Sequence, residues 1–264
     1  MPRRRVLGIL AGLGLFLSPV AFYRGEGTQA AARMRPVAAP QAAALFAAAP
    51  IAASGSDGMR AVRARSGPLA IATDQARLGV RDRPGGRVTT VPARNPWEQP
   101  LSFPVIGRKV DPRGREWLRV LLGVRPNGAS GWVPTDRVRG SAANDRIVVD
   151  LSARTLRRWH DGRLLDRFPV AVGAASSPTP AGRFFVWARL DASATGPYGT
   201  FVLGLSGFPG QTSGAQGDAR LAIHGTDDPG DLGQAVSHGC VRVLNDQLLQ
   251  LRDVAMGTLV TIRA

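Results

Sequence analysis

Residues 237–242 read Ser-His-Gly-Cys-Val-Arg, and this stretch holds the only cysteine of the chain, Cys240. Two of the three histidines are near it in sequence: His238 is two positions before Cys240, and His224 is sixteen positions before it. A thiol has a pKa of about 8.5 and is mostly protonated at neutral pH, so a nucleophilic cysteine needs a base beside it. An imidazole can take that proton and hold the thiolate as an ion pair. The stretch therefore indicates a cysteine nucleophile that is served by a histidine.

The two histidines differ in how well they can act as this base. In a strand, residues two apart share a face with their Cβ atoms about 6–7 Å apart, which is poor geometry for a direct contact between His238 and Cys240. His224 can come from a neighbouring strand, where opposed Cβ atoms lie about 4.5–5.5 Å apart. We expect His224 to hold the catalytic proton and His238 to position the loop. Gly239 leaves room for an acyl group and frees backbone N–H groups to face a developing oxyanion.

Other chemistries are compatible with the same side chains. His224, His238 and Cys240 could bind zinc, although the His-x-Cys spacing is awkward for two ligands on one strand and no carboxylate cluster supplies a general base. A buried cysteine beside a core histidine is a structural alternative, but it leaves the Ser-His-Gly-Cys cluster unexplained. A papain-like plan is excluded because no histidine follows Cys240. A sortase-like plan with Arg252 remains possible, but the short gap between His224 and Cys240 argues against it.

The residues around the cluster predict a β-rich domain over 143–264. Asp161-Gly162 is a favoured two-residue hairpin turn between two apolar runs. One short helix is expected over about 246–255, capped by Asn245. Short apolar runs predict strands at 146–151, 155–160, 164–172, 183–189 and 258–262, and Leu248, Leu251 and Val254 fall on one face of the helix.

Residues 68–142 predict a separate small β domain. Short apolar runs alternate there with the turn sequences Pro84-Gly85-Gly86, Pro112-Arg113-Gly114 and Asn127-Gly128. Trp117-Leu-Arg-Val has the alternation of a half-buried strand. The order Gly79 to Gly85, then Trp117, then Gly131-Trp132-Val133 resembles bacterial SH3-like modules that associate with the cell wall. The fold class that we expect is therefore mainly β, with a small SH3-like β-barrel before the larger C-terminal domain.

The N-terminal quarter of the chain predicts export. Met-Pro-Arg-Arg-Arg precedes an apolar run over 6–22, so residues 1–24 are typical of a signal peptide or a membrane anchor. Residues 25–67 are rich in Ala, Pro and Gly without an apolar period, and we expect a disordered tether there. The folded part would then lie in the periplasm or the cell wall, with or without an N-terminal membrane anchor.

The net charge of the chain limits the kinds of partner that we expect it to bind. The formal net charge is +15, and a basic chain suits an anionic partner such as nucleic acid, anionic lipid or acidic wall polymers. The basic residues are spread from Arg3 to Arg263, and no stretch alternates basic and aromatic residues, so we expect no nucleic-acid binding. The single cysteine excludes an intrachain disulfide and a lipid-modified N-terminal cysteine.

The C-terminal half resembles the L,D-transpeptidase (YkuD) catalytic family over residues 145–264. The resemblance rests on His224-Gly225 followed by Ser-His-Gly-Cys-apolar-Arg at 237–242, on the Pro-Thr-Pro-x-Gly-x-Phe type of stretch at 177–184, and on Pro197-Tyr198-Gly199. It implies a β-sandwich-like catalytic domain, without metal or cofactor, that cross-links peptidoglycan stem peptides through a cysteine thioester. Resolution of the same acyl-enzyme by water would give an L,D-carboxypeptidase, and resolution by a protein amine would attach a wall protein.

The resemblance also implies a role for each residue of the motif. Cys240 would attack the substrate carbonyl, and His224 would be its base, with the backbone near Gly225 orienting the ring. A non-catalytic cell-wall-binding protein is the alternative from another class, and the intact pair of His224 and Cys240 argues against it. The remaining roles are pocket shaping by Ser237 and His238, an oxyanion hole made by the N–H groups of Gly239 and Cys240, and contacts to the peptide from Arg242, Tyr198 and Gly225.

Overall fold

A computed structural model describes residues 35–36, 69–193, 195–210 and 219–264. The predicted export segment, residues 1–24, lies outside the described residues, and so does the predicted tether apart from one short stretch. That stretch, β1 (Arg35–Pro36), pairs antiparallel with Leu190 and Asp191. In the described part of the chain, no helix has the length and the apolar character that crossing a membrane requires.

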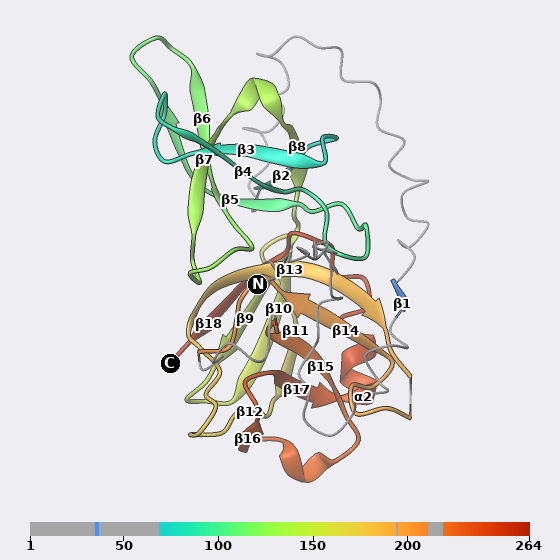
Figure 1. The fold of residues 1–264 in the computed structure, drawn as a ribbon. Coiled ribbons are helices and arrows are strands. Elements are labelled where there is room, and N and C mark those ends of the chain that lie inside the picture. The colour runs from blue at the N-terminus through green and yellow to red at the C-terminus, as the bar shows by residue number, and fades with distance from the viewer. Residues whose placement is uncertain (1–34, 37–68, 194, 211–218) are drawn as a thin grey trace, which may run out of the picture.

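The C-terminal part of the chain folds around one large mixed sheet, drawn in the lower half of Figure 1. Its strands follow the spatial order β11-β10-β9-β18-β13-β14-β15-β17. Their bounds are β9 (Asp145–Asp150), β10 (Thr155–His160), β11 (Arg163–Pro169), β13 (Gly182–Asp191), β14 (Phe201–Leu205), β15 (Ala222–Thr226), β17 (Val241–Leu244) and β18 (Leu259–Arg263). The five strands predicted from the sequence are all present, and the fold is mainly β.

Local sequence explains the first hairpin of this sheet. Asp161 and Gly162 join β10 to β11 with φ angles of 49° and 81°, which a two-residue turn of this hairpin type requires at both positions. In β9 every second residue is buried, including Ile147 and Val149, as expected for a strand with one face on a core. Leu156 of β10 and Val243 of β17, from the two ends of the sheet, belong to the same core, so the sheet curls around it.

The helix differs from its prediction. The α-helix α2 covers only Asn245–Leu249, and Asn245 is its first helical residue, whereas Leu244 occupies the cap position without a side-chain cap. The apolar spacing was interpreted correctly, because Leu248, Leu251 and Val254 are all fully buried. The chain leaves the helix after Leu249 in successive turns, and the buried Arg158 donates to the carbonyl of Gln250 at 2.5 Å. The apolar face is therefore buried without a regular helix along its whole length.

The upstream part of the chain forms a sheet of its own, in the upper half of Figure 1. The β structure predicted for residues 68–142 is confirmed, and Gly85, Gly114 and Gly128 take positive φ angles in the predicted turns. That this sheet is an SH3-like barrel stays a prediction. Its spatial order is β4-β3-β7-β6-β5-β2-β8, with β2 (Leu69–Ala72), β3 (Arg77–Arg81), β4 (Val88–Pro92), β5 (Phe103–Val110), β6 (Glu116–Leu121), β7 (Ser130–Pro134) and β8 (Arg139–Ala142).

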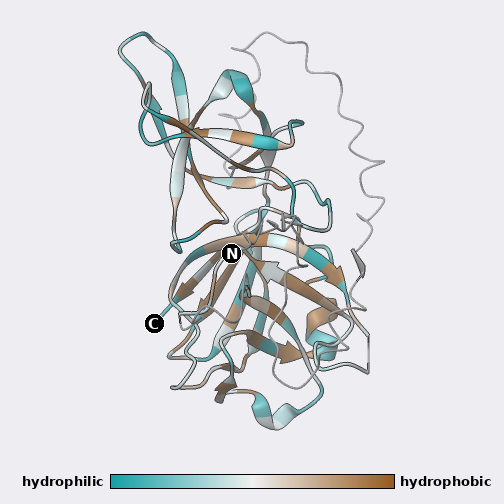
Figure 2. Cartoon of the chain, in the orientation of Figure 1, coloured by the Kyte–Doolittle hydropathy of each residue, from teal (hydrophilic) through white to brown (hydrophobic). Residues whose placement is uncertain are grey.

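The two sheets are packed against each other along β13. Gln99 Nε2 donates to the Arg189 carbonyl at 2.6 Å, and Asn95 Nδ2 donates to the Trp187 carbonyl at 3.1 Å. A second core joins Phe103 of β5 to Phe185 of β13, with their ring centroids 6.1 Å apart. Figure 2 shows apolar residues concentrated on the strands and hydrophilic residues at the turns that point away from this junction. The upstream sheet thus covers one face of the C-terminal sheet.

Candidate active site

The sheet register brings the predicted residues together in an unexpected order. β15 and β17 are parallel, with Ile223 opposite Val241 and His224 opposite Arg242. Extending the register by one residue places Cys240 opposite Ala222, so Cys240 is a diagonal neighbour of His224. His224 thus comes from a neighbouring strand, as expected, and is diagonal to Cys240 instead of directly opposed. Burial explains the register, because Ile223 and Val241 both belong to the core, and the pleat then turns His224 and Cys240 to the opposite face together.

His224 is a buried, neutral imidazole. Its Nδ1 lies 2.9 Å from the Gly225 carbonyl oxygen, which can only accept a hydrogen bond, so Nδ1 carries the proton and Nε2 is left as an acceptor. The pKa of His224 is lowered from 6.5 to about 4, mainly by burial and to a smaller extent by the charge of Arg242, while the Gly225 carbonyl and Asp231 act in the opposite direction. This tautomer is the one that a general base needs if Nε2 faces the substrate.

Cys240 is the partly buried, free cysteine of the chain. Burial raises the pKa of the Cys240 thiol, against a backbone hydrogen bond from Ala222 and the charge of Arg242, which both lower it. Burial therefore disfavours both the thiolate and the imidazolium. That the two groups form an ion pair stays a prediction.

The turn before Cys240 is held by Ser237. The Ser237 hydroxyl donates to the Cys240 carbonyl at 2.5 Å and accepts from the Gly239 N–H at 3.1 Å. Gly239 has a φ of 112°, which glycine adopts readily and a residue with a Cβ does not. The sequence analysis expected the N–H groups of Gly239 and Cys240 to form the oxyanion hole, but the Gly239 N–H is already bound to the Ser237 hydroxyl. The Cys240 N–H remains the candidate donor from this turn.

A threonine that was given no role in the sequence analysis fixes the same turn from outside. Thr179 accepts from the Gly173 N–H at 2.8 Å and donates to the Gly239 carbonyl at 2.9 Å. Gly173 belongs to β12 (Val172–Gly173), which pairs in parallel with β16 (Ala235–Ser237). Thr179 lies within the Pro-Thr-Pro stretch, and that motif was the signal that could have identified it.

Tyr198 and Gly225 contact the base, and their contacts to a peptide stay a prediction. The Tyr198 ring meets the His224 ring edge-on, with centroids 5.1 Å apart, and the Tyr198 carbonyl accepts from the Gly225 N–H at 2.8 Å. A Cβ added to Gly225 would lie 2.0 Å from Asn245 Oδ1 and 3.1 Å from the Gly199 Cα. The glycine is therefore required by close packing behind the histidine.

Arg242 is paired with an acidic residue that the sequence analysis also missed. Asp231 follows Gly230 in a short 3-10 helix, Pro229–Asp231, and accepts from Arg242 Nη1 at 2.9 Å and from the Thr226 hydroxyl at 3.0 Å. Because Arg242 is opposite His224 in the sheet, this pair sets the charge beside the base.

His238 contributes through its backbone. Its side chain is exposed, unlike that of His224, and its carbonyl accepts from the Ser177 hydroxyl at 3.0 Å. Over the ranges that the structure describes, no group of three or more His, Cys, Asp or Glu side chains has an arrangement that could hold a metal ion. The third histidine, His160, contacts Asp145 in the β10 region, away from the cluster.

Part of the chain is similar to known proteins. Residues 144–262 match the YkuD family model, described as the L,D-transpeptidase catalytic domain. This segment is thus similar to the YkuD family. YkuD of Bacillus licheniformis is 37% identical over 118 residues and YkuD of Bacillus subtilis is 34% identical over 117 residues; each alignment covers 44% of this chain and 64% of the relative.

Solved structures that carry the name L,D-transpeptidase have lower sequence identity to this chain. An L,D-transpeptidase from Mycobacterium smegmatis aligns over 74% of this chain and 82% of its own, with 19% identity and a TM-score of 0.38. An L,D-transpeptidase from Mycobacterium tuberculosis aligns over 62% of this chain and 90% of its own, with 15% identity and a TM-score of 0.41.

Proposed function

We propose that this protein is a peptidoglycan L,D-transpeptidase that works through a thioester on Cys240. The observation that carries the proposal is the buried, neutral His224, whose Nδ1–H is bound to the Gly225 carbonyl while its ring shares a sheet face with Cys240. The match of residues 144–262 to the YkuD family model supports the same reaction class.

In the first step, the Cys240 sulfur attacks a carbonyl carbon of a donor stem peptide as Nε2 of His224 takes the thiol proton. Because burial disfavours both charged forms, the proposed step moves the proton together with the attack. The tetrahedral oxygen takes up negative charge, which the Cys240 N–H can stabilise. When the C–N bond breaks, the imidazolium returns the proton to the leaving amine, and the terminal residue departs.

In the second step, an amine of another stem peptide attacks the thioester carbonyl. His224 takes a proton from the attacking nitrogen, the C–S bond breaks, and the proton returns to the sulfur. The products are a new amide cross-link and the free thiol. Water in place of the amine would give a carboxylic acid, so the activity against soluble muropeptides distinguishes transpeptidase from carboxypeptidase.

The direct test is chromatography of muropeptides after incubation with the purified full-length chain. We expect a cross-linked dimer and a released terminal residue with the wild type. Cys240→Ala should fold normally, because Ala is smaller, and should form neither product. Turnover by a well-folded Cys240→Ala variant would refute the cysteine mechanism, and hydrolysed monomer alone would assign the protein as a carboxypeptidase.

We further propose that residues 1–24 direct export and that the folded part acts in the periplasm or the cell wall, where acidic wall polymers would attract the basic chain. A fusion of residues 1–67 to a reporter that is active only outside the cytoplasm should give activity. A well-expressed but silent fusion would contradict export.

A further inference from the structure

Two hydroxyl groups from one segment hold the two peptide units on either side of Gly239. The Ser177 hydroxyl donates to the His238 carbonyl at 3.0 Å, and the Thr179 hydroxyl donates to the Gly239 carbonyl at 2.9 Å. Neither unit is cis, and a trans peptide unit has its N–H opposite to its C=O. The N–H groups of Gly239 and Cys240 therefore point away from the two hydroxyl groups that hold the carbonyls.

Gly239 by itself leaves these two peptide units free to rotate. Its φ is 112°, and a glycine reaches many backbone conformations at little cost because it has no Cβ. Rotation of the unit between Gly239 and Cys240 would bring a carbonyl oxygen to the place where the Cys240 N–H now points. A developing oxyanion would then meet a negative group instead of a hydrogen-bond donor. The direction of the peptide units around Gly239 therefore matters for an acyl transfer at Cys240.

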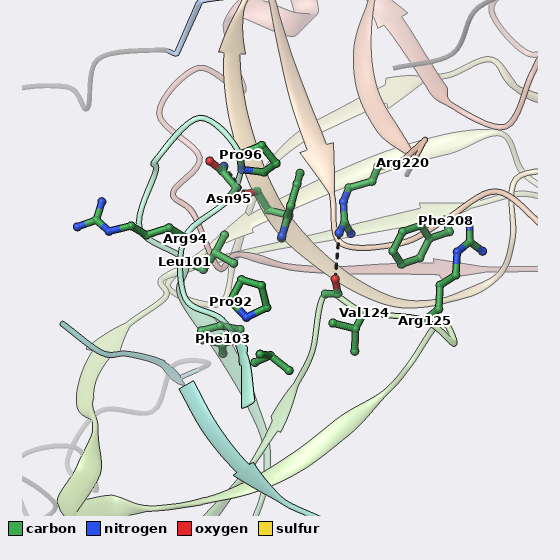
Figure 3. A pocket seen from close by; sticks show the side chains of 13 residues that line it. Pro92, Arg94, Asn95, Pro96, Leu101, Phe103, Val124, Arg125, Phe208 and Arg220 are labelled. Atoms are coloured by element: carbon green, nitrogen blue, oxygen red, sulfur yellow. Dashed lines mark hydrogen bonds between the residues drawn. The ribbon is translucent and has the colours of Figure 1, made fainter. Parts of the chain in front are cut away.

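Two other neighbours of Gly239 are apolar and cannot hold its carbonyl. A Cβ built on Gly239 would lie 3.7 Å from Leu221 Cδ2 and 3.8 Å from Pro209 Cβ. Pro209 directly follows Phe208, whose side chain lies in the wall of the cavity between the two sheets (Figure 3). The Leu221 N–H already donates to the Gly207 carbonyl, and proline has no N–H. The direction of the two peptide units is therefore set from the side of the two hydroxyl groups.

The bond from Ser177 is the first of a continuous chain that ends on the backbone of the nucleophile. The His238 carbonyl that accepts this bond belongs to the same peptide unit as the Gly239 N–H, which donates to the Ser237 hydroxyl at 3.1 Å. Ser237 in turn donates to the Cys240 carbonyl at 2.5 Å. Hydrogen bonds in such a chain polarise and strengthen one another. Loss of the first bond would therefore weaken the bonds that hold Cys240 in place.

We propose that Ser177 is a positioning residue for the oxyanion hole. Its hydroxyl holds the His238 carbonyl and so keeps the turn in the conformation that presents the Cys240 N–H to the substrate carbonyl oxygen. The inference rests on the proposed function, because an acyl transfer through Cys240 is the reaction that needs this hole. Thr179 is buried, whereas Ser177 is partly exposed, so the Ser177 hydroxyl can be removed with little effect on the fold.

The test compares two reactions of the same thiol in the full-length chain. In acylation by a carbapenem, the sulfur adds to the ring carbonyl, whose oxygen takes up negative charge before the ring C–N bond breaks. Alkylation by iodoacetamide displaces iodide at a saturated carbon and forms no oxyanion.

Ser177→Ala should slow acylation by about threefold to tenfold, the effect expected from losing one neutral hydrogen bond, and should leave alkylation at the same pH within about twofold of wild type. Ser176→Ala is the matched control, because it removes an exposed hydroxyl from the neighbouring residue, and it should change neither rate. Ser177→Thr keeps the hydroxyl, so its acylation rate should stay within about twofold of wild type.

An acylation rate of Ser177→Ala equal to that of wild type would overturn the inference and leave the proposed function standing. Equal slowing of acylation and alkylation would also overturn it, because Ser177 would then place the thiol and not the oxyanion donor. Equal slowing of acylation by Ser176→Ala would show a general effect of the segment. The wild-type chain reports on the proposed function separately: if Cys240 is alkylated but never acylated, the transpeptidase mechanism fails, and the role of Ser177 fails with it.

Discussion

Replacing Thr179 by valine should loosen the turn that carries the nucleophile. The hydroxyl is buried and bonds two backbone groups at once, the Gly173 N–H at 2.8 Å and the Gly239 carbonyl at 2.9 Å. Valine has nearly the same shape, so it removes both bonds and leaves a buried donor and a buried acceptor without partners. Each such group costs about 1–3 kcal/mol, so we expect a loss of about 2–6 kcal/mol in the free energy of unfolding.

Thr179→Ser is the matched control, because it keeps the hydroxyl and removes only the methyl group. It should lose about 1 kcal/mol, the contribution of one buried methyl. Urea denaturation of the two variants, with equal slopes, measures the difference directly. A Thr179→Val chain as stable as Thr179→Ser would refute the reasoning about these two bonds.

The same substitution should slow the chemistry, because the bond to Gly239 positions the residue next to Cys240. A small displacement of a nucleophile can cost up to about 10²-fold in rate, so we expect carbapenem acylation to be about tenfold to 10²-fold slower in Thr179→Val. Thr179→Ser should stay within a few-fold of wild type. Equal acylation rates for the two variants, measured where both are folded, would show that the turn holds its shape without Thr179.

Three further predictions concern the surroundings of His224. Its folded pKa of about 4 is below the ordinary 6.5, so between these pH values the unfolded chain takes up a proton that the folded chain does not. The free energy of unfolding should therefore fall by about 3 kcal/mol in total as the pH drops from about 6.5 to 4. If urea denaturation shows the same loss over this pH range for a His224→Gln chain, the assignment to His224 is contradicted. Gly225→Ala places a Cβ 2.0 Å from Asn245 Oδ1 and should destabilise the fold by about 1–3 kcal/mol, part of which the double variant with Asn245→Ala recovers if the clash is the cause. Because the charge of Asp231 raises the pKa of His224, Asp231→Asn should move the acidic limb of the acylation rate to lower pH, whereas Asp227→Asn, an exposed neighbour, should leave it in place; a shift to higher pH would reverse the assigned role.

What the sequence predicted well was local. The β10–β11 hairpin follows from Asp161-Gly162, because only a few residue types adopt positive φ at both turn positions. The cluster of Cys240 and His224 follows from residue types whose chemistry needs each other. The helix was too long in the prediction, because the spacing of Leu248, Leu251 and Val254 records burial, and turns can bury those side chains as well as a helix can.

The features that the sequence could not predict depend on contacts between segments that are far apart in the chain. Thr179 and Gly239 are sixty residues apart, and nothing local to Thr179 indicates that its hydroxyl reaches that carbonyl. The diagonal placement of Cys240 depends on which residues of β15 and β17 face the core, which is decided by the whole sheet. The docking of Asn95 and Gln99 on β13 likewise follows from how two separately predicted domains pack.

The claim that Cys240 forms an acyl-enzyme is tested most directly by intact mass of the full-length chain after incubation with a carbapenem. We predict one added carbapenem per chain, located on the peptide that contains Cys240, and no addition to Cys240→Ala. His224→Ala should still form the adduct but slower by about 10²–10⁴-fold, as expected for loss of a general base. An unmodified wild-type chain, or an adduct that persists in Cys240→Ala, would contradict the account.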